Sequence, residues 1–583
     1  MSLPVEAASR NIDIHRDSVL LHELQRLDAQ RGPLPKTRWG MPFRNSTLSR
    51  LAQQHYTPDT FAAVKKVLSE TDALKLHTHN EHAVSVDGIP QTVTAIAATE
   101  AKTNGDMSEM VWIRDQSQAA RSLIMAVKYV PDKGSKRYMA EKKMAGDVTL
   151  STMHLLSTEP QLDRFQSIIS DPSKADDYLN WPQIAIKFTR LDSHEPTEWR
   201  HNQEAFQMAG LTAFEAIDTD ILTVHDLAKG NKKAMASMMP FLAAVDFTNR
   251  ENCGSWEEVP AVRTSVIGVE TALLHQISEH AANPDFAFLE EGFTQAKGQL
   301  LEHKDQTSFQ DTSFDTTTSF GEAVDILVDK GLRKIGQQLP FESPDYDPTS
   351  PKHCMADVAL LYLLDYDIPK LLADRQIPIV AAGGKTLSRR EIEDMILAQM
   401  GKLYDPKTHG FFRYGVEDQN PDTYLMGNYA TDGMQQKIKE MKNALKQEAN
   451  GGAIDLDEKR RRRAQIVPKG RPAAWVHQNA QLSAWANRRY KETHDEHYLD
   501  IATETYNRAL SMATGEDEHH SLLNGDGSHH VQKVPAFRFP ECLPTMTTPD
   551  GKHFVTISPN VPLSWATAKM NEATVLLEAA IIL

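Results

Sequence analysis

The feature that most constrains the fold is a helical pattern that recurs along the chain with few strand signals between its copies. Residues 261–275 and 498–510 place apolar side chains every three or four positions, which puts one apolar stripe along each helix. The same pattern occurs at 58–74, 116–130, 203–217, 232–245, 319–335, 354–365, 388–402, 474–490 and 563–582. The strongest strand signal is the segment VSVDGIPQTVTAI at 84–96.

Helices of this length joined by long polar loops predict an all-α protein. No unit recurs at a fixed period, so a helical-repeat solenoid is not favoured. An α/α toroid needs no sequence repeat, because inner and outer helices alternate and their connections form a site at one end. We therefore expect an (α/α)6 barrel, or six-hairpin toroid, over 58–583. It would carry an N-terminal arm at 1–57 and a polar loop insertion at about 430–472.

Composition narrows the choice of partners. Hydrophobic residues make up 40% of the chain and charged residues 24%, as in ordinary globular proteins. The formal net charge of -16 repels phosphate backbones and anionic lipids, so we expect neither a nucleic acid nor a membrane as partner. We expect a monomer. No basic segment followed by an apolar one opens the sequence, so the protein is expected in the cytoplasm, or outside the cell if a signal peptide has been removed.

Cysteine and histidine spacing argues against a metal site. Cys253, Cys354 and Cys542 form no paired motif, which excludes a disulfide scaffold and a cysteine-ligated zinc site. Whether Cys253 and Cys542 bond to each other is left open. The histidine pairs at 519–520 and 529–530 are interpreted as facing solvent, and no HExxH motif occurs. We expect no metal and no cofactor.

Five short stretches mix aromatic and charged residues in a way that suits sugars. A sugar ring is neutral, its flat faces stack on tryptophan and tyrosine, and its hydroxyls bind arginine, carboxylates and amides. Cleavage of a glycosidic bond needs two carboxyls, about 6.5–9.5 Å apart for inversion or about 5 Å apart for retention. The stretches are VWIRD (111–115), WRHNQ (199–203), CGSWEEV (253–259), RYGVEDQNPDTYLMGNY (413–429) and FPECLP (539–544).

The adjacent glutamates of CGSWEEV are poor candidates for an acid and base that act together. Side chains of neighbouring residues point in different directions, so Glu257 and Glu258 would not face each other across a sugar. The partner carboxyl must come from elsewhere in the chain, and FPECLP supplies Glu541.

In their order and rough spacing these stretches resemble the glucoamylase family of glycoside hydrolases, family 15, and the related phosphorylase-kinase α-subunit domain. The resemblance spans about residues 75–583. It implies that Glu257 is the general acid, that Glu541 is the general base and that Glu258 contacts substrate. It also implies that Arg114 and Asp115 bind the hydroxyls of the terminal glucose.

The same resemblance implies further substrate-binding residues. They are Trp112, Trp199, Trp256, Arg413, Tyr424 and Trp475. The segment around Trp199 departs from the family pattern, because Arg200 stands where the family has glycine. The acidic residue that follows is either Glu204, shifted by one position, or absent, so contacts there are left open.

The implied activity is exo-hydrolysis of an α-1,4-linked glucan such as starch or glycogen, with release of β-D-glucose from the non-reducing end. Two alternatives stay open. The chain could be a non-catalytic glucan- or protein-binding regulatory module, like the kinase-subunit domain. It could also hydrolyse other α-glucosides, such as isomaltose, dextran or trehalose, on the same barrel.

Overall fold

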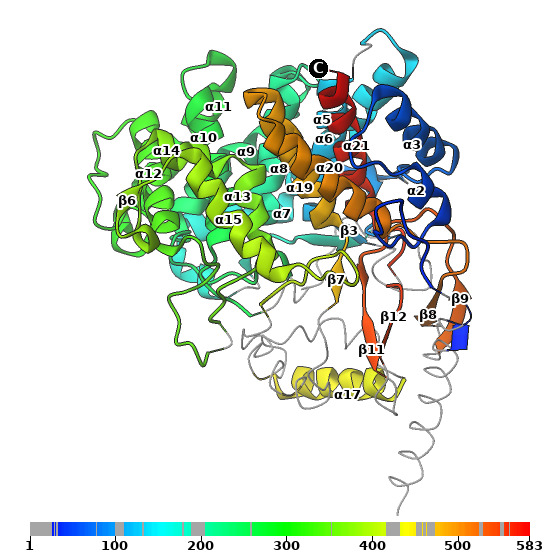
Figure 1. Ribbon diagram of the computed structural model, residues 1–583. Coiled ribbons are helices and arrows are strands. Elements are labelled where there is room, and N and C mark those ends of the chain that lie inside the picture. The colour runs from blue at the N-terminus through cyan, green and yellow to red at the C-terminus, as the bar shows by residue number, and fades with distance from the viewer. Residues whose placement is uncertain are drawn as a thin grey trace, which may run out of the picture.

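The computed structural model describes most of the chain. The described residues are 26–27, 30, 33–76, 78–99, 110–130, 133–177, 180–187, 204–256, 259–350, 352–415, 432–449, 458, 462, 473–523, 529–547, 553–558 and 560–582. Among them helices dominate, and the strands occur in short antiparallel pairs rather than in one extended sheet. Figure 1 shows most of the long helices side by side in the upper part of the view.

A closed ring of inner helices forms the centre of the fold. Each of these helices contacts the next, and the last contacts the first. They are buried on nearly every side, as expected of helices that are surrounded by others. In ring order they are α5 (Ile113–Tyr129), α8 (Glu204–Asp218), α10 (Thr264–His280), α13 (Leu361–Asp365), α19 (His477–Thr493) and α21 (Ser564–Ile582).

An outer layer of amphipathic helices packs against this ring. In α12 the buried residues Phe320, Val324, Leu327 and Leu332 recur at helical spacing on one face. The first outer helix packs against α21, so the two ends of the barrel sequence meet. The outer helices are α3 (Pro58–Glu70), α6 (Lys136–Leu156), α9 (Lys229–Ala244), α12 (Phe320–Gln338), α15 (Arg389–Leu403) and α20 (Glu496–Ser511). Alternation of inner and outer helices confirms the all-α (α/α)6 barrel expected from the sequence.

Short strands lead into the inner helices and mark one end of the barrel. Strand β3 (Met110–Trp112) precedes α5 and pairs with β4 (Ala185–Lys187). Strand β7 (Ala474–Trp475) precedes α19 and pairs with β10 (Cys542–Leu543). Both β3 and β7 lie below the labelled parts of α5 and α19 in Figure 1. The N-terminal ends of the inner helices and the segments that enter them therefore share one end of the ring.

The predicted strand segment at 84–96 is a hairpin attached to the outer layer. Strands β1 (Thr78–Val86) and β2 (Ile89–Ile96) join through Asp87 and Gly88, whose φ values of 53° and 75° suit a tight two-residue hairpin turn. The Asp87 carboxylate accepts the backbone N–H of Gly230 at 2.6 Å and so caps the first turn of α9.

A buried network of charges ties the inner helices together. Asp365 of α13 accepts Arg488 of α19 at 2.9 Å and Lys569 of α21 at 3.2 Å, and Arg121 of α5 lies 3.5 Å away. Glu572 accepts Arg488 at 2.8 Å and Lys569 at 3.1 Å. Because every charge in this set has an opposite partner, the network holds the helices of the ring in register.

Three smaller features concern the segment before α3, the cysteines and the lengths of the helices. Residues before α3 lie against α20 and the segment after it: Arg44 pairs with Glu518 at 2.8 Å, and Tyr56 donates to Asn507 at 2.7 Å. All three cysteines are buried thiols, so no disulfide joins Cys253 and Cys542. In the part of the chain that the structure describes, no helix is both long and apolar enough to cross a membrane.

One expectation about histidines is wrong. His520, interpreted as facing solvent, is buried, and its Nδ1 lies 3.4 Å from the carbonyl of Ser558. It belongs to β8 (His519–Leu523), where successive side chains point to opposite faces, so one residue of an adjacent pair must point inward.

Candidate functional site

Aromatic rings from separate parts of the chain meet at the N-terminal end of the inner helices. The guanidinium of Arg413 lies 3.9 Å from the ring centroid of Trp475 and 4.6 Å from that of Trp256. The two tryptophan rings are 5.2 Å apart. Arg413 is thus stacked against both indoles, a favourable contact between a cation and aromatic faces. This cluster joins three predicted site residues from 253–259, 413–429 and β7.

A second group of rings packs next to this cluster. His477, the first residue of α19, packs on Trp565 near the start of α21 with ring centroids 4.0 Å apart. The guanidinium of Arg114 lies 5.4 Å from the Trp565 ring, and its Nη1 donates to the carbonyl of Ser255 at 2.5 Å. The VWIRD stretch, the residue before Trp256 and the last helix therefore converge.

Asp115 lies beside Arg114 in the first turn of α5. Their nearest side-chain atoms are 3.5 Å apart, and both side chains are largely buried. Burial raises the pKa of Asp115, and the neighbouring Arg114 opposes that shift. Trp112, also predicted to bind substrate, pairs with Ala185 between β3 and β4 and packs within the hydrophobic core.

Glu541 is held at the same end by the strand pair that carries Trp475. Its carbonyl accepts the backbone N–H of Val476 at 3.4 Å, and its own N–H donates to the carbonyl of Asn560 at 3.0 Å. Its carboxylate accepts the Asn560 amide at 2.8 Å and the Ser558 hydroxyl at 3.3 Å. These contacts orient a carboxyl that is only 4% exposed.

Electrostatics link Glu541 to the rest of the site. Burial raises the pKa of Glu541, while hydrogen bonds from Asn560 and Ser558 and the charge of Arg413 oppose that rise. The neighbouring Asp115 adds to the rise. Glu541 therefore lies within electrostatic reach of both Arg413 and Asp115, which are residues from distant motifs.

Three buried N–H groups at this end have no hydrogen-bond partner among the residues that the structure describes. They are the indole N–H groups of Trp475 and Trp565 and the Nδ1 atom of His477. Burial lowers the pKa of His477 well below its usual value, and Lys569, Arg114 and Arg413 add to the effect, so the ring is neutral. Since the Gln478 amide donates to its Nε2 at 2.9 Å, we assign the remaining proton to Nδ1.

Some predicted site residues fall outside the described part of the chain. They are Glu257, Glu258, Trp199 and Tyr424. The residues on either side of the glutamate pair are described: Trp256 and Val259 are both buried. The indole N–H of Trp256 donates to Asp357 at 2.7 Å.

Sequence reasoning missed several residues at this end. His477 follows Trp475 by two positions, and Trp565 lies in the stretch VPLSWATA at 561–568. Both residues could therefore have been found from aromatic side chains near the starts of helices. Asp357 and Arg263 were missed because neither lies in a recognisable sequence motif. Glu270 was also missed, whereas Glu204 was considered as the acidic residue after Trp199. Both glutamates are fully buried, their carboxylates have no hydrogen-bond partner among the described residues, and burial raises the pKa of each.

Metal ligation finds no support in this geometry. Across the described ranges, no group of three histidine, cysteine, aspartate or glutamate side chains is placed to hold a metal ion.

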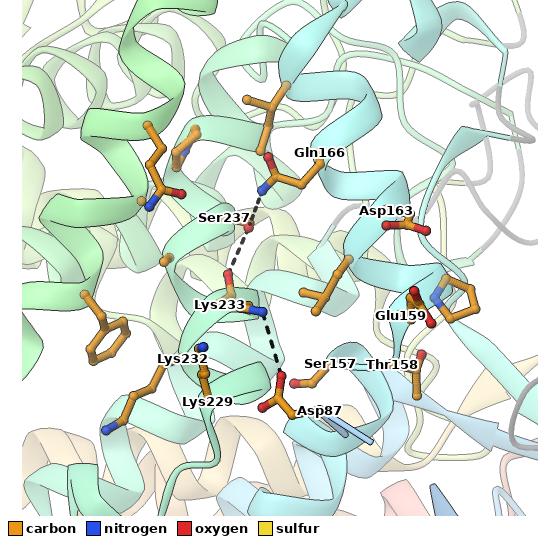
Figure 2. A pocket seen from close by; sticks show the side chains of 18 of the residues that line it. Asp87, Ser157, Thr158, Glu159, Asp163, Gln166, Lys229, Lys232, Lys233 and Ser237 are labelled. Atoms are coloured by element: carbon orange, nitrogen blue, oxygen red, sulfur yellow. Dashed lines mark hydrogen bonds and ion pairs between the residues drawn. The ribbon is translucent and has the colours of Figure 1, made fainter. Parts of the chain in front are cut away.

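A large cleft lies elsewhere, on the outer layer. It has a volume of about 1300 Å³ and lies between α7 (Glu159–Ser170), α9, α11 (Ala287–Glu302) and the turn of the β1–β2 hairpin. In Figure 2 Lys233 faces Asp87 across one part of the cleft, and Glu159 and Asp163 lie on another side of it. Phe288 is the one aromatic residue in its described lining. The cleft therefore lacks the aromatic faces that distinguish the end of the barrel.

Comparisons with known proteins identify no family. No model of a protein family matches the chain. It is 26% identical over 219 residues to the uncharacterized lipoprotein YgeQ of Escherichia coli (strain K12), which covers 35% of this chain and 74% of that protein.

Solved structures with a similar backbone path include glycosidases. A glycosidase in complex with glucose is 12% identical, covers 91% of this chain and 98% of its own, and has a TM-score of 0.45. The glucoamylase of Hormoconis resinae is 10% identical, covers 89% of this chain and 73% of its own, and has a TM-score of 0.33. TM-scores of this size establish neither a shared fold nor a shared function.

Proposed function

We propose that this protein is a glycoside hydrolase that removes glucose from the non-reducing ends of α-1,4-linked glucans with inversion. The observation that carries the proposal is the grouping of a buried carboxyl, charged side chains and aromatic rings at one end of the barrel. There the buried carboxyl of Glu541 lies in electrostatic reach of Arg413 and Asp115, at the same end as aromatic rings whose N–H groups have no acceptor among the described residues.

A ligand rich in hydroxyls would supply hydrogen-bond acceptors to the three N–H groups of this cluster. A buried N–H without an acceptor costs about 1–3 kcal/mol, so three of them favour a ligand or water that brings acceptor atoms. Sugar hydroxyls are such acceptors, and sugar faces stack on indole rings. Trp475, Trp565 and His477 offer both features within one patch.

The proposed chemistry assigns one step to each carboxyl. Glu257 would donate a proton to the glycosidic oxygen as the bond from that oxygen to the anomeric carbon breaks. Glu541 would accept a proton from the water that attacks the opposite face of the ring, so the product would be β-glucose. Asn560 and Ser558 support this role, because donors to a carboxylate favour the ionised form that a base requires.

Exo action would follow if Arg114 and Asp115 close the substrate path at one end. Arg114 and Asp115 are adjacent, largely buried and close to the Trp565 ring, so they suit the hydroxyls of a terminal sugar. Trp256 and Arg413 would line the next part of the path, with Trp475 behind Arg413.

The test is hydrolysis of a substrate panel of maltose, isomaltose, trehalose and glycogen by the wild type and by Glu541→Gln. We expect glucose from maltose and glycogen, and a loss of at least about 1000-fold in kcat for Glu541→Gln, because the base would be removed. Preference for isomaltose or trehalose would overturn the assigned linkage. Binding of glycogen without cleavage of any substrate would identify a non-catalytic module instead.

A further inference from the structure

We propose that Asp357, acting together with Arg263, is a positioning residue that holds Trp256 and Val259, the described residues on either side of Glu257 and Glu258. The inference rests on the proposed function for its catalytic consequence. Its structural content, that this pair fixes both flanks of the loop, is independent of the substrate.

Asp357 fixes the residue that directly precedes Glu257. The indole N–H of Trp256 donates to Oδ1 of Asp357 at 2.7 Å, and the backbone N–H of Ala359 donates to the same oxygen at 2.8 Å. Asp357 is fully buried. Because no water competes for a buried carboxylate, this contact restrains the Trp256 ring strongly.

Arg263 fixes the backbone on both sides of the glutamate pair. Its Nε donates to the carbonyl of Asn252 at 3.2 Å, and its Nη2 donates to the carbonyl of Val259 at 2.8 Å. Asn252 also pairs with Ala261 through an isolated bridge, so the loop closes on itself. A rigid planar guanidinium that spans two carbonyls sets the width of the loop.

The two holding residues are coupled to each other. Nη1 of Arg263 lies 3.6 Å from Oδ2 of Asp357 and 3.9 Å from Oε1 of Glu342. Ser265 donates its N–H to Glu342 at 3.0 Å and its hydroxyl at 2.6 Å. Burial and the neighbouring Glu342 raise the pKa of Asp357 to about 8, and the charge of Arg263 opposes that rise.

The same contacts reach the segment that carries Glu541, directly before β10. Trp256 stacks against Arg413, and the carbonyl of Arg413 accepts the N–H of Val358, the residue after Asp357, at 3.0 Å. Arg413 stacks in turn against Trp475, which pairs with the residue after Glu541. Asp357 therefore lies between Trp256, which precedes the proposed acid, and the residues Arg413 and Trp475, which pack beside the segment of the proposed base.

A double-mutant cycle tests the contact. Asp357→Ala and Trp256→Phe should each lower kcat on maltose by about 10- to 100-fold, because misplacement of a reacting group acts on the transition state. Asp357→Ala, which is not assigned a substrate contact, should change KM by less than about threefold. The double variant should lose no more than the worse single variant, because both remove one interaction. Asp357→Asn keeps the acceptor for Trp256 and should stay within about fivefold of the wild type.

Trp181→Phe is the matched control. Trp181 is also buried, donates its indole N–H to the carbonyl of Ala175 at 2.9 Å, and packs on Phe241 of the outer helix α9. It should lose stability but keep kcat within about twofold. Additive losses in the cycle, or an equal loss of kcat in Trp181→Phe, would overturn the positioning role.

Hydrogen exchange measured by mass spectrometry provides a readout that does not depend on activity. Peptides covering 252–263 should exchange at least about tenfold faster in Asp357→Ala than in the wild type, and at the wild-type rate in Trp181→Phe. Unchanged exchange in Asp357→Ala would overturn the inference. Faster exchange in a protein that hydrolyses none of the substrates would refute the proposed function and still support the holding of the loop by Asp357.

Discussion

Removal of the Asn560 amide should move the acidic limb of the pH–activity profile to higher pH. The amide donates to the Glu541 carboxylate at 2.8 Å in a fully buried setting. A hydrogen bond to a charged group contributes about 1.5–3 kcal/mol, and one pKa unit corresponds to about 1.4 kcal/mol. Since the bond favours the ionised form, its loss in Asn560→Ala should raise the pKa of Glu541 by about one to two units.

The assay is the pH dependence of kcat/KM on maltose, whose acidic limb reports ionisation of the essential base in the free enzyme. Because the base must be ionised, a higher pKa for Glu541 moves this limb upward and leaves the upper plateau nearly unchanged. Ser558→Ala removes a longer contact of 3.3 Å and should give a smaller shift in the same direction. An acidic limb that stays in place in Asn560→Ala would refute Glu541 as the base that this limb reports.

Two further predictions concern stability. Asp365→Asn should lower the free energy of unfolding in urea by about 3–5 kcal/mol, because it leaves Lys569, Arg121 and Arg488 without their shared carboxylate. Burial alone would raise the pKa of Asp365, but these cations together lower it, so the difference from wild type should be full above about pH 4 and shrink in more acidic solution. Equal stability of the two proteins at pH 7 would contradict the network. Gly254→Ala should destabilise by about 1–2 kcal/mol from its left-handed backbone alone, and further because its new Cβ would lie 2.6 Å from Cδ of Arg263. Gly383→Ala, with a similar φ of 70° and open space around it, is the matched control, and an equal loss in both would exclude the contact with Arg263.

The sequence predicted the inner helices well because their apolar patterns are long and regular. The segment predicted at 116–130 forms α5, and the segment at 563–582 forms α21. Helix α11 was missed, since Gly292 and Gly298 weaken its local signal. Gly292 is required by packing: a Cβ there would lie 2.7 Å from Cβ of Ala236, so α11 approaches α9 closely only without a side chain. Helix propensity depends on the local sequence alone, so it gives no information about the packing of Gly292 against Ala236.

The candidate site was only partly accessible to sequence reasoning. Short motifs identified Arg114, Asp115, Arg413, Trp475 and Glu541, and the structure brings these residues to one end of the barrel. The stacking of Arg413 between two indoles was not predicted, because it depends on how separate loops pack. Asp357 was missed for the same reason, since the residue it holds, Trp256, lies 101 positions away in the chain.

The central claim is that Glu541 and Glu257 invert the anomeric centre of a glucan. Proton NMR of the first glucose released from soluble starch by the purified protein tests this claim most directly. The account predicts that the β-anomer is released first and that the α-anomer grows in later by mutarotation, with neither signal in Glu541→Gln. Early release of the α-anomer, or glucose formation that persists in Glu541→Gln, would contradict it.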